Sequence, residues 1–332
     1  MDCIAYDCPL VLTSQKSRSL QKGQVRIRTR FAGINYADLL ACQGKYQEKS
    51  KPPFSPGLEV SGQIVECNGC SSRQVGDRVY CIFSANGAFA EECVVDESRC
   101  FLVPQHIPLN AITSLGINFC TASLGLEVAA KMSEGEVVTV TGAAGGTGLA
   151  ATELSLSRHH PTVCVVRGQQ QKEFLNNLLR DSYPNEDYII IDSEDTIDFR
   201  DCIKSRYGGS DVVFDTVGTE SMFNKNLLRS VRFGAHIRLV VVGFSGGSIQ
   251  QIPANHLLVK NCSALGIYLG GYLKNRPEVV QKCIDSLCEL YTTKQLHPHL
   301  FKVYPLESAN EALNMMKGKK IFGKILLEMN HE

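Results

Sequence analysis

The chain has 332 residues, of which 34 are basic and 34 acidic, so its formal net charge at neutral pH is zero. Hydrophobic residues make up 44% and charged residues 20%, which is ordinary for a folded globular protein and argues against disorder. Without a basic stripe or a run of roughly 18 apolar residues, we expect neither nucleic acid nor a membrane as a partner.

The N-terminus, Met1–Tyr6, lacks a basic region followed by an apolar core, so we expect no secretory signal. Fourteen cysteines then favour a reducing compartment over a disulfide scaffold. We therefore expect a cytoplasmic protein, with a mitochondrial location left open.

Residues 1–112 are rich in strand and turn signals. Val25–Arg30 and part of Gly62–Glu66 alternate with period two, and Gly76–Tyr80 is typical of a turn that enters a strand. Asn86-Gly87 predicts a hairpin turn before a strand at Ala88–Glu92. Since no strand–helix–strand alternation occurs here, a compact β-rich domain is predicted.

Cys67 and Cys70 have CxxC spacing, which leaves three interpretations open: a turn with two free thiols, a redox-active pair, or a metal site. No second CxxC follows to complete a zinc site, and Asn68-Gly69 is a strong turn dipeptide. The pattern favours the turn.

From residue 113 onward the pattern changes to strands that alternate with helices. Short apolar strands are predicted at Val137–Thr141, Thr162–Val166, Tyr188–Ile191, Val212–Asp215 and Ile237–Val242, with helices from near Gly146 and over Gln171–Leu179. This alternation predicts an α/β fold with a doubly wound parallel sheet, which binds ligands beyond the carboxyl ends of its strands.

The remaining chain predicts two helices and a closing strand. Val279–Tyr291 has helical spacing that turns Cys283 and Cys288 toward a core. Ser308-Ala-Asn-Glu311 matches a capping box and predicts a helix through Met316. Gly323–Glu328 predicts a strand.

The strongest local motif is the glycine-rich stretch Thr141–Ala150, between an apolar strand and a helix. Gly145 and Gly146 let the main chain approach a pyrophosphate, and Thr147 follows in the first helical turn, where free N–H groups favour an anion. The spacing differs from G-x-G-x-x-G, so a glycine-rich turn without a ligand stays open.

The end of the next strand indicates which dinucleotide is preferred. Sites for NAD usually place an acidic residue there, but Val165–Lys172 has none. Arg167 and Lys172 can instead meet a 2′-phosphate, the alternative being two solvated cations. NADPH is the predicted cofactor.

Several stretches resemble the zeta-crystallin-like quinone oxidoreductase branch of the medium-chain dehydrogenase/reductases. They are Ala32–Leu40, Gly44–Tyr46, Pro56–Gly62, Gly76–Val79, Ala143–Ala150, Val242–Gly247, Ile252–Asn255, Lys260-Asn261 and Gly266–Tyr272. The resemblance covers nearly the whole chain and implies a Rossmann domain inserted into a GroES-like β-rich catalytic domain. The implied segments are 1–112, catalytic; 113–254, NADPH-binding, with an edge strand to about 268; and 269–332, which returns to the catalytic domain.

The same resemblance implies site residues. Zinc-dependent relatives place Cys and His where this chain has Asn35 and Leu58, so no metal is expected. Asn35, Tyr36 and Tyr46 would line the nicotinamide cleft as the catalytic residues. Cofactor contacts are implied at Asn35, Thr121, Val217, Gly243, Phe244, Tyr268 and Leu269. Lys172 matches a lysine of the 2′-phosphate pocket, where Gln169 replaces the usual Ser.

The function expected from the resemblance is zinc-independent, NADPH-dependent reduction of quinones or similar activated carbonyl compounds. Two alternatives stay open: an enone or enal double-bond reductase, and a largely non-catalytic NADPH-binding protein. The resemblance also implies a homodimer that forms through the edge strand Cys262–Ile267.

Overall fold

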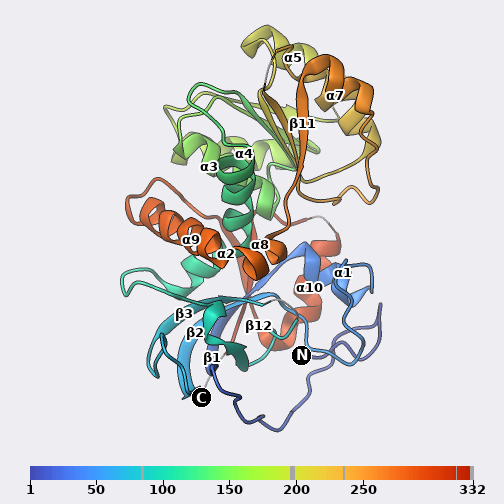
Figure 1. Cartoon of the computed structure of the whole chain (residues 1–332). Coiled ribbons are helices and arrows are strands. Elements are labelled where there is room, and N and C mark those ends of the chain that lie inside the picture. Colours follow the sequence, from blue (N-terminus) through green and yellow to red (C-terminus); the bar gives the residue numbers. More distant parts are fainter. Residues whose placement is uncertain (84–85, 195–198, 235, 319, 330–332) are drawn as a thin grey trace. The chain divides into compact units, whose positions relative to one another are not determined.

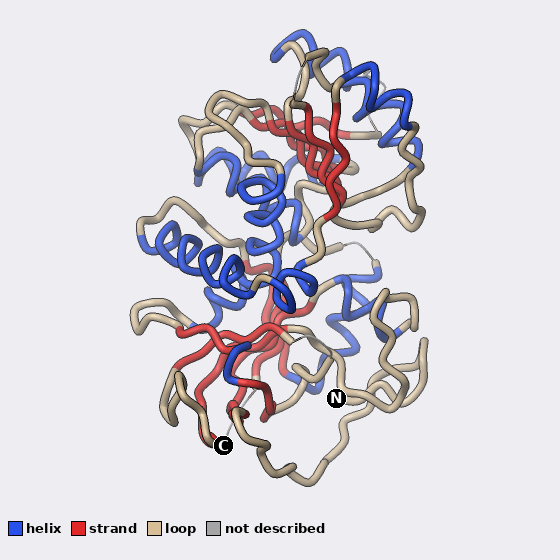
Figure 2. Tube along the Cα trace, in the orientation of Figure 1, coloured by secondary structure: helices blue, strands red, loops and turns tan. Residues whose placement is uncertain are grey.

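The structure is a computed structural model of the chain and describes all residues except 84–85, 195–198, 235, 319 and 330–332. The chain forms two compact units (Figures 1 and 2). The first contains Met1–Ile117, Gly270–Thr292 and Pro298–Glu332, and the second contains Asn118–Leu269 and Thr293–His297. The predicted fold class is confirmed: a unit with a parallel α/β sheet is inserted, along the chain, into a β-rich unit.

The first unit is built on a mixed sheet with strand order β12-β13-β1-β2-β3-β5, and β4 also pairs with β1. The strands are β1 (Gln24–Ile34), β2 (Glu59–Asn68), β3 (Arg78–Ile82), β4 (Glu92–Asp96), β5 (Cys100–Leu102), β12 (Leu300–Pro305) and β13 (Lys324–Glu328). Because β13 pairs antiparallel with β1, residues from both ends of the chain share one sheet.

Alternation along the strands gives this sheet its core. Val25 and Ile27 of β1 are fully buried and pack with Val60 and Ile64 of β2. Helix α1 (Tyr36–Cys42) packs against α10 (Ala309–Lys317), and apolar residues of both helices join the same core. The unit also contains α9 (Pro277–Thr292), most of α8 (Leu269–Asn275) and the short turns η1 (Glu97–Arg99) and η4 (Leu306–Ser308). In α9, Cys283 and Cys288 are buried, as predicted.

The hairpin predicted at Asn86-Gly87 is wrong. Strand β4 begins at Glu92, where the predicted strand ends, and pairs with β1. The segment before it is held by the loop around Gly57, whose carbonyl accepts from Ala88 N at 3.2 Å, while Ala88 and Phe89 are fully buried. Burial against that loop decides the path of this segment, and residues 84–85 lie outside the described part.

Helix α10 forms where predicted, but the prediction of a capping box at its start is wrong. Ser308 makes no side-chain capping hydrogen bond. It ends the 3-10 turn η4 with φ −89° and ψ 14°, so its main chain is not in the extended conformation that a capping side chain requires.

The CxxC pair lies in a turn at the end of β2, and Gly69 has φ +62°. Both thiols are free and half-buried, with Cys70 Sγ 3.4 Å from Gln24 O. Burial raises the pKa of Cys67 to about 11, so its thiolate is disfavoured. This environment supports the interpretation as a turn with two free thiols and argues against a redox-active pair.

The second unit has a six-stranded sheet with order β11-β10-β9-β6-β7-β8, and all its strand pairs are parallel. Its strands are β6 (Val138–Thr141), β7 (Thr162–Val166), β8 (Tyr188–Asp192), β9 (Val212–Asp215), β10 (Ile237–Val241) and β11 (Cys262–Gly266). The parallel sheet and the edge position of the strand predicted at Cys262–Ile267 are confirmed.

Helices cover both faces of this sheet. The helices of this unit are the part of α2 (Leu109–Ser123) from Asn118 onward, η2 (Leu124–Ala129), α3 (Gly146–Ser157), α4 (Gln169–Ser182), α5 (Phe199–Tyr207), η3 (Ser221–Leu227), α6 (Leu228–Ser230) and α7 (Ala254–Lys260). Val163 of β7 packs with Ile203 of α5, whereas the next residue, Cys164, contacts Thr152 of α3. Successive residues of a strand therefore serve opposite helical layers.

The helical stretch Leu109–Ala129 is long and apolar enough to cross a membrane by length and composition. However, 72% of its most apolar 18-residue segment is buried inside the structure. It contains a kink at Gly116, and the boundary between the two units falls directly after Ile117. This burial is typical of a core helix.

Candidate functional site

The glycine loop after β6 is built by close main-chain packing. Gly142 has φ +62°, and a methyl group on Gly148 would lie 2.1 Å from Gly142 O. Gly145 is extended at the start of α3, and a methyl group there would meet only Gly142 O, at 3.3 Å. No side chain caps α3. Its first N–H groups can therefore bind an anion, the feature that a dinucleotide pyrophosphate requires.

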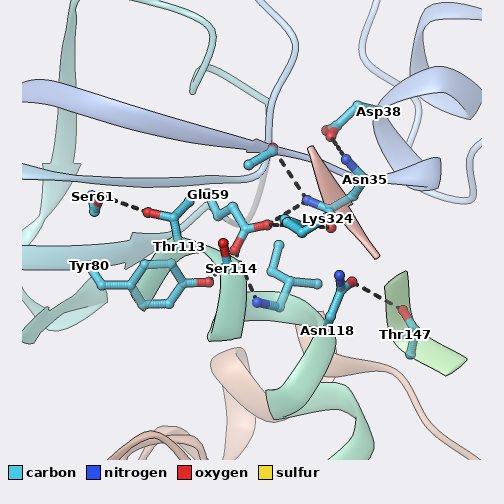
Figure 3. A network of polar contacts seen from close by, with 12 residues as sticks. Asn35, Asp38, Glu59, Ser61, Tyr80, Thr113, Ser114, Asn118, Thr147 and Lys324 are labelled. Carbon is cyan, nitrogen blue, oxygen red and sulfur yellow. Dashed lines mark hydrogen bonds and ion pairs between the residues drawn. The ribbon is translucent and has the colours of Figure 1, made fainter. Parts of the chain in front are cut away.

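Asn118 of α2 fixes this helix start and was missed by the sequence analysis. Its Oδ1 accepts from Thr147 Oγ1 at 3.2 Å, and a methyl group on Gly146 would lie 2.6 Å from Asn118 Nδ2 (Figure 3). Gly146 is thus required by Asn118 rather than by open space for a ligand. Thr121, predicted to contact the cofactor, lies half-buried one turn further along α2.

Because all strand pairs of this sheet are parallel, the carboxyl ends of its strands share one edge. That edge brings together most of the predicted cofactor residues: Gly145, Gly146 and Thr147 after β6, Arg167, Gln169 and Lys172 after β7, Val217 after β9, Gly243 and Phe244 after β10, and Tyr268 and Leu269 after β11. Gly218 packs beneath Phe244, because a methyl group there would lie 2.6 Å from the ring. This is the edge where doubly wound sheets bind their ligands.

Asp215, the last residue of β9, organises the same edge and was also missed. It is 1% exposed and accepts hydrogen bonds from Thr141 Oγ1 at 2.6 Å and from the amides of Val217 and Gly218 at 3.0 and 3.2 Å. Burial raises its pKa despite these donors. Asp215 therefore ties the end of β6 to the turn that carries Val217.

The predicted 2′-phosphate residues lie around the start of α4. Arg167 is exposed and forms an ion pair with Glu194, with Arg167 Nε 2.9 Å from Glu194 Oε1. Gln169 donates through Nε2 to Glu173 Oε1 at 3.0 Å, and Lys172 is half-buried. Arg167 was recognisable from the sequence but its acidic partner was not, because Glu194 lies 27 residues away along the chain.

In the first unit, a buried ion pair joins β2 to β13 (Figure 3). Lys324 Nζ lies 2.5 Å from Glu59 Oε1, with the two side chains 3% and 0% exposed. The other oxygen, Glu59 Oε2, accepts from Tyr80 OH at 2.5 Å and from Ile117 N at 3.0 Å. The kink at Gly116 frees that amide, and a methyl group on Gly116 would lie 2.2 Å from Glu59 Oε2. Every oxygen of the buried carboxylate is satisfied.

Asn35, predicted as both catalytic and cofactor-binding, belongs to this network. Its Nδ2 donates to Glu59 Oε1 at 2.8 Å, and its Oδ1 accepts from Lys324 Nζ at 2.8 Å. The residue is only 7% exposed. The amide is thus fixed in one orientation by two charged neighbours.

Asp38 lies beside Asn35 and accepts from its backbone amide at 2.7 Å. It is fully buried, and its Oδ1 has no hydrogen-bond partner among the described residues. Burial raises its pKa to about 7, against the opposing effects of the Asn35 amide and Lys324. This carboxyl group therefore titrates near neutral pH.

The two predicted catalytic tyrosines lie at the start of α1 and just after its end. Tyr36 is the first residue of the helix and is half-buried, and Tyr46 follows the helix and is also half-buried. Burial raises the pKa of Tyr46 to about 12, with Glu48 and Asp38 adding to the effect. Its phenol therefore remains a hydrogen-bond donor at neutral pH.

A zinc ion does not fit this region. Asn35 and Leu58 provide neither thiolate nor imidazole, and Lys324 already supplies a cation to Glu59. Across the residues that the structure describes, no group of three or more His, Cys, Asp and Glu side chains is arranged to hold a metal ion.

Comparison with known proteins identifies relatives of both units. Residues 21–105 match the alcohol dehydrogenase GroES-like domain, and residues 186–327 match the family described as zinc-binding dehydrogenase. The chain is 34% identical over 337 residues to quinone oxidoreductase-like protein 2 of Bos taurus, an alignment that covers 98% of this chain and 91% of that protein.

Solved structures share the fold. The quinone oxidoreductase from Thermus thermophilus, solved alone and with NADPH, superposes with a TM-score of 0.81 at 23% identity, covering 98% of each chain. The JamJ enoyl reductase superposes with a TM-score of 0.82 at 21% identity, covering 96% of this chain and 94% of that one. At these identities the likeness shows the fold alone.

Proposed function

The chain belongs to the quinone oxidoreductase-like branch of the medium-chain dehydrogenase/reductase superfamily, and we propose that it reduces quinones with NADPH without a catalytic zinc. Membership makes it an NAD(P)-dependent oxidoreductase that acts on small molecules. The observation that carries the proposal is the uncapped start of α3 behind the Gly142–Gly148 turn.

NADPH is proposed over NADH because of the turn after β7. The residues that follow β7, Arg167–Lys172, include no carboxylate to hold a ribose 2′-hydroxyl, whereas Arg167 can form two parallel hydrogen bonds to a 2′-phosphate. Lys172 on the first turns of α4 adds a second positive charge to the same helix start.

When bound, the nicotinamide supplies a hydride to the quinone, and a proton from water completes the hydroquinone. The protein's own residues bind and orient. Asp215 and Thr141 hold the strand ends in place, and the phenols of Tyr36 and Tyr46 are the proposed donors to the quinone oxygens. Asn35, with its amide already bonded to Glu59 and Lys324, is assigned to orienting α1 rather than to proton donation.

We propose a homodimer that pairs through the edge strand β11. Ser263 and Ala264 of this strand are exposed, and the adjoining α7 exposes Leu258 and Val259, at 77% and 63%. An unpaired strand edge beside exposed apolar side chains is a surface that proteins usually cover. The fourteen free cysteines support a reducing compartment, so the proposed location is the cytoplasm, with mitochondria as the alternative.

Steady-state oxidation of NADPH in the presence of phenanthrenequinone tests the proposal, with an enone as the competing acceptor and a chelator in parallel reactions. We expect oxidation that depends on the quinone, exceeds that with the enone and resists the chelator. Preference for the enone would replace the proposed substrate class. Binding of NADPH without turnover of either acceptor would replace catalysis by a binding role.

A further inference from the structure

The turn after β8 (Tyr188–Asp192) places an acidic side chain, Glu194, beside the turn after β7, and the proposed NADPH site does not use it. We propose that Glu194 determines cofactor specificity: its carboxylate occupies the place beside Arg167 that a 2′-phosphate would take, and so weakens the preference for NADPH over NADH. This inference rests on the proposed function.

The carboxylate of Glu194 contacts Arg167, one of the predicted 2′-phosphate residues. Glu194 Oε1 is 2.9 Å from Arg167 Nε. Glu194 Oε2 is 3.6 Å from the position that a methyl group on Gly168 would occupy. Gly168 is the residue before α4, so the carboxylate is paired with the guanidinium and lies near the start of that helix.

This placement is fixed by the main chain and does not depend on the exposed ion pair alone. Asp192, at the end of β8, is 5% exposed. Its Oδ1 accepts from Gly168 N at 2.8 Å and from Glu194 N at 3.0 Å, so a single buried oxygen joins the two turns. Whatever rotamer Glu194 adopts, its backbone remains beside the start of α4.

The start of α4 is a place where an anion is stabilised. The helix has 14 residues, and no side chain caps it. A helix N-terminus favours a carboxylate for the same reason that it favours a phosphate, because unpaired N–H groups and the helix dipole attract negative charge. Glu194 can therefore substitute for the 2′-phosphate in the protein without cofactor.

The two cofactors respond to Glu194 differently. The 2′-phosphate of NADPH must displace the carboxylate from Arg167 and is repelled by it, whereas the 2′-hydroxyl of NADH can donate a hydrogen bond to it. Because Arg167 and Glu194 are 68% and 57% exposed, the pair is solvent-screened and displaceable. The structure thus predicts a chain that accepts both cofactors.

Fluorescence titration with NADPH and NADH tests the role of Glu194 without an electron acceptor. Replacing it by glutamine should lower the Kd for NADPH about three- to fivefold, the range of an exposed charge pair, and should leave the Kd for NADH equal or higher. The matched control is Asp187→Asn, which removes the same charge from an Arg206 ion pair at the opposite end of β8. We expect it to change neither Kd.

The Arg167→Met background tests the route of the effect. If Glu194 acts by competing for this guanidinium, Glu194→Gln should gain at most half as much NADPH affinity there. An equal gain in both backgrounds, an equal change for both cofactors, or no change in either would overturn the inference while leaving the proposed function standing. Failure of both cofactors to bind the natural chain would instead overturn the proposed function and the inference with it.

Discussion

Each glycine in the loop after β6 is required for a different physical reason. Gly142 needs a left-handed main chain, Gly146 makes room for Asn118, and Gly148 lets α3 approach the carbonyl of Gly142. A pattern of glycines predicts a phosphate-binding turn, but only the structure shows which glycine faces main chain and which faces a side chain.

Substituting Gly148 tests the loop directly. In Gly148→Ala the new methyl group would lie 2.1 Å from Gly142 O, and main chain cannot yield as a flexible side chain can. We expect the Kd for NADPH to rise at least about tenfold, since misplaced N–H groups lose charge-assisted hydrogen bonds. Titration should show no change for Gly234→Ala, where nothing lies within 4 Å of the new methyl group. Unchanged affinity in Gly148→Ala would contradict this account of the loop.

Glu153 of α3 links stability to pH in the second unit. It is fully buried, accepts from Tyr183 OH at 3.0 Å and from His297 N at 2.9 Å, and burial raises its pKa from 4.5 to about 7. A carboxyl group whose pKa is higher in the folded state binds more protons there. Its contribution to the free energy of unfolding is therefore complete below pH 4.5 and declines as the pH rises to about 7.

In the natural chain, deprotonation of Glu153 should lower the free energy of unfolding by roughly 2–3 kcal/mol between these pH values. We therefore expect the free energy of unfolding of Glu153→Gln to fall less over the same pH range. Urea unfolding at pH 5 and pH 8 should show a smaller difference for the variant than for the natural chain. Asp38, whose pKa is also raised to about 7, contributes in the same direction in the first unit. Equal differences in Glu153→Gln and the natural chain would contradict the assignment.

At the scale of elements, β13 contributes both a buried and an exposed ion pair, which makes a controlled comparison possible. Lys324 is buried against Glu59, whereas Glu328, four residues further along β13, pairs with Arg30 of β1 near the surface. Only the first pair leaves an uncompensated charge in the interior when one partner is removed.

Replacing Lys324 by methionine should lower the unfolding free energy by about 3–5 kcal/mol, because Glu59 would stay buried without its cation. Arg30→Met should cost less than about 1 kcal/mol. Adding Glu59→Gln to Lys324→Met should recover part of the loss. Urea unfolding followed by circular dichroism checks all three, and equal losses in Lys324→Met and Arg30→Met would contradict the buried network.

Strands and helices whose local sequence pattern agrees with the fold could be predicted from the sequence. The parallel strands are mostly apolar and follow each other at regular spacing, so the sheet and its ligand-binding edge were recognisable. The hairpin at Asn86-Gly87 failed because burial of Phe89 against the Gly57 loop overrides a local turn signal.

Contacts between distant segments could not be predicted in this way. Glu59 and Lys324 are 265 residues apart, and no periodic pattern relates them. Asn118, Asp215 and Glu194 were missed for the same reason, although Asp215 closes an apolar strand, a position that could have drawn attention to it. The resemblance supplied Asn35 and the tyrosines, but not the two bonds that fix the Asn35 amide.

At the scale of the whole molecule, the exposed side of α7 and β11 predicts self-association. Size-exclusion chromatography with light scattering should give a dimer for the natural chain and a monomer for Leu258→Asp, which places a charge in the proposed interface. Val75→Asp introduces the same side chain at a residue of the first unit that is 61% exposed, and should remain a dimer. A monomeric natural chain would contradict the proposed dimer.

We propose that a nicotinamide cofactor, bound at the carboxyl edge of the second unit's sheet, gives its hydride to a quinone without help from a metal. A direct test compares NADPH with NADPH deuterated at the transferred position, during phenanthrenequinone reduction with and without a chelator. We expect the deuterated cofactor to be oxidised more slowly, and we expect the chelator to change neither rate. Activity that the chelator removes and zinc restores, or no quinone-dependent oxidation at all, would contradict it.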